Sequence, residues 1–421
     1  MITIPIKLNS LIIKTSQFAL ILSFFFLPIN LFANNLFLTI FLIIFGIYTV
    51  TNFNEKSINR MRMKWQLLST LNIPILLLLI GLIYSSNIEG ALKDLGRIIP
   101  LFFISTYIIL NPSFFKRTLK YIMYALILGC LISALICWGI SILEITRDGG
   151  SLLDLISREY ASHKLADNIG IHTPYLALII NLAIGFNILI LNDSRRIISK
   201  WILIVSLLIL ILFLFNLMAR NAIFCFIFFG IIFLILKKKI LWLTAFIALL
   251  SLLGGYAYFT EKNFLRDRFF KSVNVFENET IFSKKDGRFD RLEASYEVFK
   301  QFPFVGPGAA SEDLLRKKQY YINRDSEAYN ENYNAHNQFM EYLSTYGILG
   351  GLAYILFFVV IFKTVFRKRS FFLFFATGCF FVANLTESLL ERSWGVVIYI
   401  LVIMLLVTWE GNRNNKLLQN E

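Results

Sequence analysis

The sequence has little charge and few cysteines or histidines. Charged residues make up 16% of the 421 positions and hydrophobic residues 57%, with four cysteines and three histidines in the whole chain. Soluble domains have about 25% charged and roughly 45–50% apolar residues, so this composition argues against a soluble enzyme, a disordered protein and a coiled coil. The cysteines all lie within apolar runs, so they imply neither a disulfide framework nor a metal cluster. They are Cys130, Cys137, Cys225 and Cys379.

Several motifs that carry chemistry are also missing. The sequence has no Asp-x-Asp pair, no glycine-rich phosphate loop of the nucleotide type and no His/Cys spacing of a metal site. These absences argue against a nucleotide-sugar enzyme and against an ATP-driven pump. An enzyme of this composition that stabilises a phosphate leaving group would need arginines in place of a metal.

Apolar residues are abundant, with 43 Phe and 18 Tyr among them. Recurring apolar runs of about 18–22 residues indicate transmembrane helices, because one globular core could not bury so many such side chains. We predict an all-α polytopic membrane protein of about twelve transmembrane helices, with the first run retained as a span instead of removed as a signal peptide. The predicted spans are 18–33, 36–50, 67–86, 98–111, 121–144, 173–191, 201–219, 221–236, 240–259, 344–362, 371–386 and 394–409.

The net charge of +14 fits the positive-inside rule. A soluble protein with this charge would suggest a nucleic-acid partner. Here every second connection is short and basic, so we expect these connections and both termini to face the cytoplasm, and we expect no nucleic acid. Two opposite connections are longer, 145–172 and 260–337. The second holds 13 basic and 13 acidic residues, and long loops escape the charge rule, so it can lie outside as one large loop with short helices.

One charge, Arg220, interrupts the apolar stretch 201–236. At 1.5 Å per residue this stretch would make about 54 Å of helix, enough for two spans of roughly 30 Å. Both flanks are basic and therefore cytoplasmic, so the turn at Arg220 should lie at the outer face. Two interpretations remain open: an interfacial arginine that snorkels to lipid headgroups, and an anion-binding residue.

The loop 260–337 contains a predicted amphipathic helix and a tight turn. The apolar face of the helix consists of Phe289, Leu292, Tyr296 and Phe299. This face would lie on the membrane or on the helix bundle, and Pro303 would end the helix. The Gly-Pro-Gly segment 306–308 predicts a turn where backbone can approach a ligand. Arg288, near the helix start, is either a solvated surface residue or an anion-binding residue.

A polar segment precedes the next apolar helix. Asn334 is expected to cap that helix, which would place His336 in its first turn at the outer membrane surface. An imidazole there can act as a general base near neutral pH, although a structural role is the alternative. The other two histidines, His163 and His172, also fall on the predicted outer side.

These residues together resemble the O-antigen ligase family. The resemblance rests on Met218-Ala219-Arg220-Asn221, Arg288, Pro303, Gly306, Gly308, His336-Asn337, Gly347 and Gly350. O-antigen polymerases and membrane oligosaccharyltransferases share this signature. We therefore divide the chain into N-terminal transmembrane helices (1–200), a signature region that includes the loop 260–337 (201–365), and C-terminal helices with a cytoplasmic tail (366–421).

The resemblance implies a GT-C-like glycosyltransferase of lipopolysaccharide biosynthesis in the cell inner membrane. Such an enzyme would transfer O-antigen from undecaprenyl diphosphate to a sugar hydroxyl of lipid A–core at the periplasmic face. Membrane lipids would surround it, and it would need no cofactor, no metal and no ATP. The alternatives are an O-antigen polymerase or a protein O-oligosaccharyltransferase with the same donor. A lipid-linked oligosaccharide flippase is a further alternative, disfavoured because the two halves show no repeat.

The same resemblance implies the roles of individual residues. Arg220 and Arg288 would hold the diphosphate and stabilise it as it leaves, with Arg291 as a further donor contact. His336 would deprotonate or orient the acceptor hydroxyl. Secondary candidates are Asn337, His172 and Glu387, the last through ion pairing with the arginines.

Overall fold

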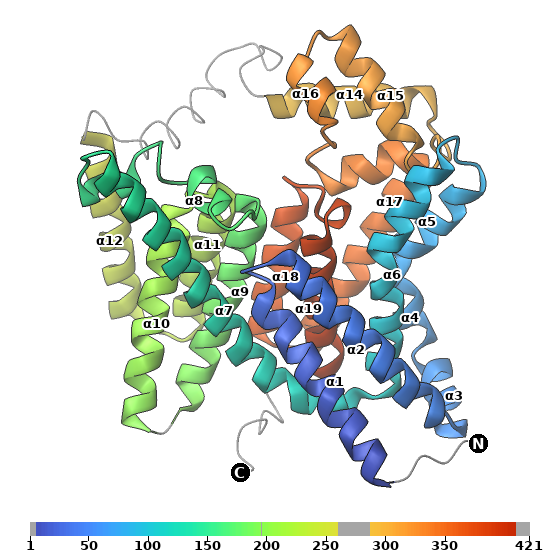
Figure 1. Cartoon of the computed structure of the whole chain (residues 1–421), viewed down its shortest axis with the longest axis horizontal. Coiled ribbons are helices and arrows are strands. Elements are labelled where there is room, and N and C mark those ends of the chain that lie inside the picture. Colours follow the sequence, from blue (N-terminus) through green and yellow to red (C-terminus); the bar gives the residue numbers. More distant parts are fainter. Residues whose placement is uncertain (1–5, 195, 260–286, 410–421) are drawn as a thin grey trace. The chain divides into compact units, whose positions relative to one another are not determined.

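The structure is a computed structural model that describes residues 6–194, 196–259 and 287–409 (Figure 1). Those residues form helices and no strand, as the all-α prediction requires. The chain divides into two compact units, which are described separately. One is Met1–Leu27 with Leu31–Ala125 and Asp286–Glu421, and the other is Pro28–Asn30 with Leu126–Lys285.

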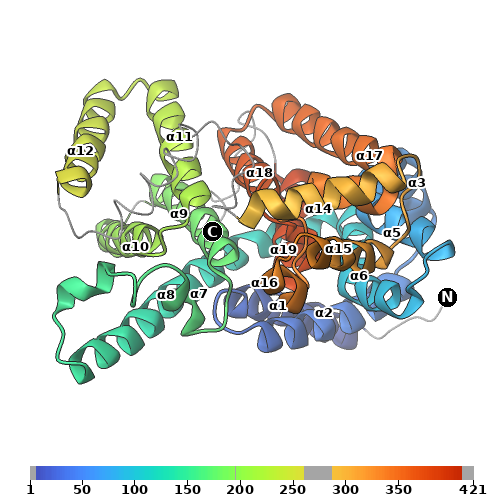
Figure 2. The ribbon, with the colours of Figure 1, turned by 90° about the horizontal axis from the view of Figure 1, so that it is seen from above.

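Helix α19 is the centre of the first unit. It is buried continuously from Gly395 to Leu406 and packs against α6, α17 and α18 (Figures 1 and 2). The helices of this unit are α1 (Ile6–Phe26), α2 (Leu31–Thr51), α3 (Glu55–Met63), α4 (Trp65–Leu71), α5 (Ile73–Ile83), α6 (Ile88–Leu110), α14 (Gly287–Gln301), α15 (Ser311–Ile322), α16 (Ser326–Glu331), α17 (Gln338–Lys368), α18 (Phe371–Asn384), the 3-10 turn η2 (Leu389–Glu391) and α19 (Ser393–Thr408). An apolar helix with no polar stripe suits the centre of such a bundle.

Helix α9 is the central helix of the second unit. It is buried continuously from Tyr175 to Asn187 and packs against α10 and α11. Its Asn181 donates a 2.8 Å hydrogen bond to the Ala222 carbonyl of α11, which satisfies a polar group inside an apolar interface. This unit contains the η1 turn (Leu152–Ile156), α8 (His163–Asp167), α9 (Thr173–Asp193), α10 (Ile197–Asn216), α11 (Arg220–Leu236) and α12 (Ile240–Phe259), and α7 (Pro112–Arg147) enters it from the first unit.

Each predicted span overlaps a helix or a bent helix pair, but a count of twelve is not confirmed, and α6, which overlaps the predicted span 98–111, is not among the candidate membrane spans. Among the described residues, six helices are long and apolar enough to cross a membrane, and α4 with α5, bent by 64°, can make a seventh. Helices α11, α18 and α19 and the segment Ile240–Leu252 are apolar but shorter. The bounds 18–33 of the first predicted span are wrong, because α1 already begins at Ile6 and ends at Phe26.

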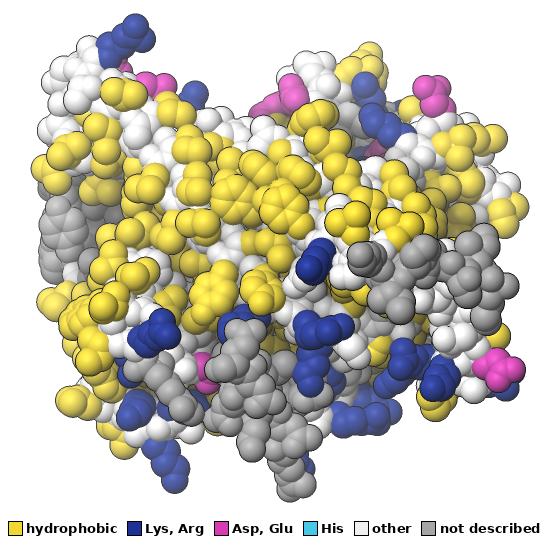
Figure 3. Space-filling view, turned by 60° about the horizontal axis from the view of Figure 1, so that its bottom comes forward, with side chains coloured by type: hydrophobic (Ala, Val, Ile, Leu, Met, Phe, Trp, Pro, Cys, Tyr) yellow, Lys and Arg dark blue, Asp and Glu magenta, His cyan; other side chains and the backbone are white. Residues whose placement is uncertain are grey.

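The surface of the helices suits a lipid environment. Many large side chains are exposed, among them Phe32 at 77%, Val50 at 76% and Leu143 at 71%. Figure 3 shows broad hydrophobic areas on one face, with lysine and arginine side chains gathered toward the lower edge of that view. This separation of apolar and basic side chains is what the positive-inside rule produces. The cytoplasmic position of both termini stays a prediction.

The loop 260–337 is described only from residue 287, and its residues 260–286 lie outside the described part. From 287 it forms α14, α15 and α16, which gather near the start of α17 (Figure 2). Helix α14 is confirmed and ends at Gln301, just before Pro303, but the predicted apolar face is not the one that packs. Ala294, Ser295 and Val298 are buried, whereas Tyr296 is 47% exposed. Small side chains face the bundle because α15 and α17 lie close to the α14 backbone there.

The Gly-Pro-Gly segment approaches another part of the chain, and its approach to a ligand stays a prediction. A Cβ atom on Gly306 would lie 2.1 Å from the Thr345 carbonyl oxygen, and a Cβ atom on Gly347, whose φ is +64°, would lie 2.5 Å from the Phe304 carbonyl oxygen. The Ile348 N–H donates to the Pro303 carbonyl at 2.8 Å. The segment 303–308 therefore interrupts α17 at Gly347 and takes over hydrogen bonds that a continuous helix would make internally.

We predict that Gly347→Ala destabilises the protein by about 2 kcal/mol or more, because the new Cβ meets the Phe304 carbonyl and φ is positive. Thermal unfolding of the purified protein in detergent measures the effect as a lowered Tm. Gly139→Ala on α7 is the matched control, since a Cβ there meets nothing within 4 Å. An unchanged Tm for Gly347→Ala would contradict the proposed backbone crossing.

Candidate functional site

Three predicted residues of the first unit lie together. The Nδ1 atom of His336 is 3.1 Å from Glu387 Oε2, and the Arg288 guanidinium is 3.6 Å from Glu387 Oε1. The side chain of Glu387 is 5% exposed, that of His336 14% and that of Arg288 38%. One buried carboxylate therefore lies between an imidazole and a partly exposed arginine.

The segment before α17 positions the histidine, in a way that corrects the predicted cap. Asn337, not Asn334, caps α17: its Oδ1 accepts from the Met340 N–H at 3.0 Å. His336 thus precedes the helix instead of lying in its first turn, with φ +49°. Its N–H donates to Asn334 Oδ1 at 3.1 Å. A non-glycine residue in the left-handed region stores strain, and such residues cluster at functional sites.

Asn337 also joins this segment to the residues after α18. Its Nδ2 donates to the Leu385 carbonyl at 2.9 Å, two residues before Glu387. One side chain therefore caps a helix and fixes the distance between the chain segments that carry His336 and Glu387. The contacts show Asn337 positioning the site; a direct contact with substrate stays a prediction.

Arg291 stacks on an aromatic ring. Its guanidinium carbon lies 3.9 Å from the centroid of the Tyr333 ring, and that ring meets the His336 ring edge-on at 5.8 Å. Arg291 thus holds the Tyr333 ring beside His336 through a cation–π contact. Its role in donor binding remains a prediction.

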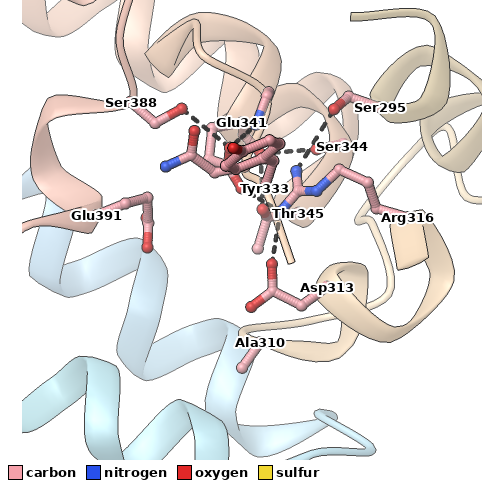
Figure 4. A network of polar contacts seen from close by, with 12 residues as sticks. Ser295, Ala310, Asp313, Arg316, Tyr333, Glu341, Ser344, Thr345, Ser388 and Glu391 are labelled. Atoms are coloured by element: carbon pink, nitrogen blue, oxygen red, sulfur yellow. Dashed lines mark hydrogen bonds and ion pairs between the residues drawn. The ribbon is translucent and has the colours of Figure 1, made fainter. Parts of the chain in front are cut away.

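Glu341, which we did not predict, contacts the chain neighbours of His336 and Glu387; Figure 4 shows its position near Ser388 and Arg316. Its Oε2 accepts from the Ala335 N–H at 2.7 Å and from the Ser388 hydroxyl at 3.0 Å. Ala335 precedes His336 and Ser388 follows Glu387. The carboxylate of Glu341 therefore anchors both partners of the His336–Glu387 contact by their chain neighbours.

The other oxygen of Glu341 pairs with a buried arginine. Arg316 Nη2 lies 2.8 Å from Glu341 Oε1 and 2.5 Å from Asp313 Oδ1, and Nη1 donates to Ser295 Oγ on α14 at 3.4 Å. Arg316 is 1% exposed. This guanidinium connects α14, α15 and α17, so the helix that carries Arg288 is tied to the one that follows His336.

Two further predicted residues, Arg220 and His172, belong to the second unit. Arg220 is the first residue of α11 and follows a turn in which Met218 has φ +49°. This confirms that the chain breaks between two apolar helices at this arginine, which is half-buried. His172 occupies the N-cap position of α9 without a side-chain capping hydrogen bond, and its ring lies 5.6 Å from that of His163. Convergence of either residue with Arg288 and His336 stays a prediction.

Of the two residues that we did not predict, the sequence could have indicated Glu341 but not Arg316. Glu341 is an isolated acid in the first turn of an apolar helix, where burial demands a partner, so it could have been singled out. Arg316 stands beside Lys317 and Lys318 in a polar loop, and nothing local marks it as the buried member. Its role appears only when α14, α15 and α17 are packed together.

Residues 204–355 match the family model described as O-antigen ligase. The chain therefore carries the signature of that family over this region, which contains Arg220, Arg288 and His336 and ends before Glu387. The match supports an enzyme of the ligase or polymerase kind, a membrane glycosyltransferase in the coarse sense, acting on lipid-linked glycans. No curated protein matches the chain.

We predict that Arg316→Met destabilises the fold by about 3–5 kcal/mol, because it leaves buried carboxylates without their cation. Adding Glu341→Gln to this variant should recover part of the loss by removing one of those charges. Tm in detergent measures both effects. Lys318→Met, on the exposed side of α15, should leave Tm unchanged, and an equal loss in both single variants would contradict the buried ion pair.

Proposed function

We propose that this protein is an O-antigen ligase that transfers glycan from undecaprenyl diphosphate to a sugar hydroxyl of lipid A–core, at the periplasmic face of the inner membrane. The observation that carries the proposal is the contact of both His336 and Arg288 with the buried carboxylate of Glu387, within and beside the matched region. A base and a cation for a phosphate are the two functions that such a transfer requires.

The proposed reaction needs one bond formed and one broken. The acceptor hydroxyl oxygen attacks the anomeric carbon of the glycan, the bond from that carbon to the diphosphate breaks, and undecaprenyl diphosphate leaves with the electron pair. In the tautomer with its proton on Nδ1, His336 donates to Glu387 and keeps Nε2 free to take the hydroxyl proton. The carboxylate then stabilises the imidazolium that forms, as in triads of nucleophilic enzymes.

Arginine supplies the charge that the leaving group needs. Arg288 is partly exposed next to the base, and a guanidinium binds phosphate oxygens in a bidentate manner. Arg220 is assigned to the same diphosphate by its place in the signature. The activated diphosphate bond supplies the energy, so the proposed reaction uses neither ATP nor a metal ion.

The polymerase and the protein oligosaccharyltransferase use the same donor and differ in the acceptor. The flippase differs in kind, because it forms no covalent product. The contact of His336 with a buried carboxylate favours transfer over transport, since moving a lipid-linked glycan requires no base.

The decisive assay supplies undecaprenyl-diphosphate glycan and rough lipopolysaccharide to the purified protein in detergent, without nucleotide. We expect glycan on lipid A–core with the wild type and at least a hundredfold less with His336→Ala, since general-base catalysis contributes about 10²–10⁴-fold. Longer undecaprenyl-linked chains would establish a polymerase. No covalent product of either kind would refute the transferase.

Arg288→Ala should abolish transfer while folding and membrane insertion stay intact, and Arg288→Lys should recover little of it, because an ammonium cannot replace the bidentate fork. Lys300→Ala, at the exposed far end of the same helix α14, is the matched control and should keep full activity. Transfer and Tm are measured on the same preparations. Normal transfer by Arg288→Ala would remove this residue from diphosphate binding.

A further inference from the structure

A carboxylate cluster beside the Arg316–Glu341 pair has no part in the proposed transfer. Glu312 and Asp313 lie in the first turn of α15, and Glu341 lies in the first turn of α17. One carboxylate oxygen from each of the three lies within 4.8 Å of the other two. Glu312 is 5% exposed and Glu341 1% exposed, so two of the three carboxylates are buried.

Glu312 has an oxygen with no partner. Its Oε2 atom is buried and accepts no hydrogen bond in the described structure, whereas both oxygens of Glu341 accept hydrogen bonds. An unpartnered buried carboxylate is costly, because water no longer solvates its charge. Burial raises the pKa of Glu312 well above its usual value; the nearby charges of Asp313 and Glu341 raise it further, and Arg316 opposes them.

The charges of this cluster do not balance. Ionised Glu312, Asp313 and Glu341 carry three negative charges, and Arg316 returns one positive charge. Two negative charges remain, which is the charge that one divalent cation neutralises. The nearby Arg97 does not balance these charges, because it already pairs with the carboxylates of Asp94 and Glu391.

The chemistry of the donors selects a hard cation. Ca²⁺ binds carboxylate oxygens at about 2.3–2.6 Å in a flexible geometry, whereas Mg²⁺ at about 2.1 Å requires a near-ideal octahedron and retains several waters, so an irregular set of buried carboxylates favours Ca²⁺. We propose that Glu312, Asp313 and Glu341 bind one calcium ion that joins the start of α15 to the start of α17. The ion takes no part in the transfer reaction.

Such an ion would act on the site through Glu341. That carboxylate already holds Ala335 and Ser388, the neighbours of His336 and Glu387. A calcium ion on Glu341 would therefore stiffen the two segments that carry the base and its carboxylate. Its effect should appear as stability and not as a changed reaction.

The test uses the full-length protein in detergent, stripped with EDTA and then freed of it. Calorimetric titration with CaCl₂ should show one bound ion, and Tm should rise with calcium and rise less with MgCl₂.

Glu312→Gln should weaken calcium binding at least tenfold and abolish the rise in Tm. Asp313→Asn, a partly exposed second ligand variant, should also weaken binding. Glu293→Gln, an exposed glutamate on α14, is the matched control and should respond like the wild type.

Two results would overturn the proposal: wild-type protein that neither binds calcium nor gains Tm, or a Glu312→Gln variant that responds as the wild type does. A wild-type Tm that rises on acidification and does not respond to calcium would show that protons, and not calcium, neutralise the carboxylates. This result would also overturn the proposal. His336→Ala should keep the calcium response, so this test is independent of whether the proposed transfer occurs.

Discussion

The buried pair of Arg316 and Glu341 is the interaction on which the site depends. Glu341 uses both oxygens, one toward the guanidinium and the other toward Ala335 and Ser388. A buried carboxylate with this many charged and polar donors is satisfied, and each donor comes from a different chain segment. The positions of His336 and Glu387 therefore follow from a contact that neither residue makes.

A second constraint on the site is a close contact between two backbone segments, which does not depend on charge. The segment 303–308 crosses α17 at Gly347, and a Cβ on either Gly306 or Gly347 would overlap a main-chain carbonyl of the other segment. This explains why glycines accompany the charged residues in the signature. They let a loop replace part of a helix, which fixes the loop that leads from α14 to α15 against the helix that follows the histidine.

Hydropathy alone predicted where most apolar helices lie and the break at Arg220, because a run of apolar residues limits the local structure to a helix and a charge near its middle limits where the chain turns. The buried face of α14 and the cap of α17 could not be predicted in this way. Both Asn334 and Asn337 are good caps, and the choice depends on the Leu385 carbonyl that binds Asn337. The burial of Arg316, and not of Lys317, likewise depends on the packing of three helices.

The proposed chemistry makes use of the unequal exposure around Glu387. The imidazole and the carboxylate are mostly covered, so their hydrogen bond is stronger than it would be in water. Arg288 is more exposed, and its 3.6 Å separation from Glu387 makes a loose ion pair that costs little to exchange. In the proposed reaction an incoming diphosphate can replace Glu387 as the partner of Arg288, while the carboxylate keeps its contact with His336.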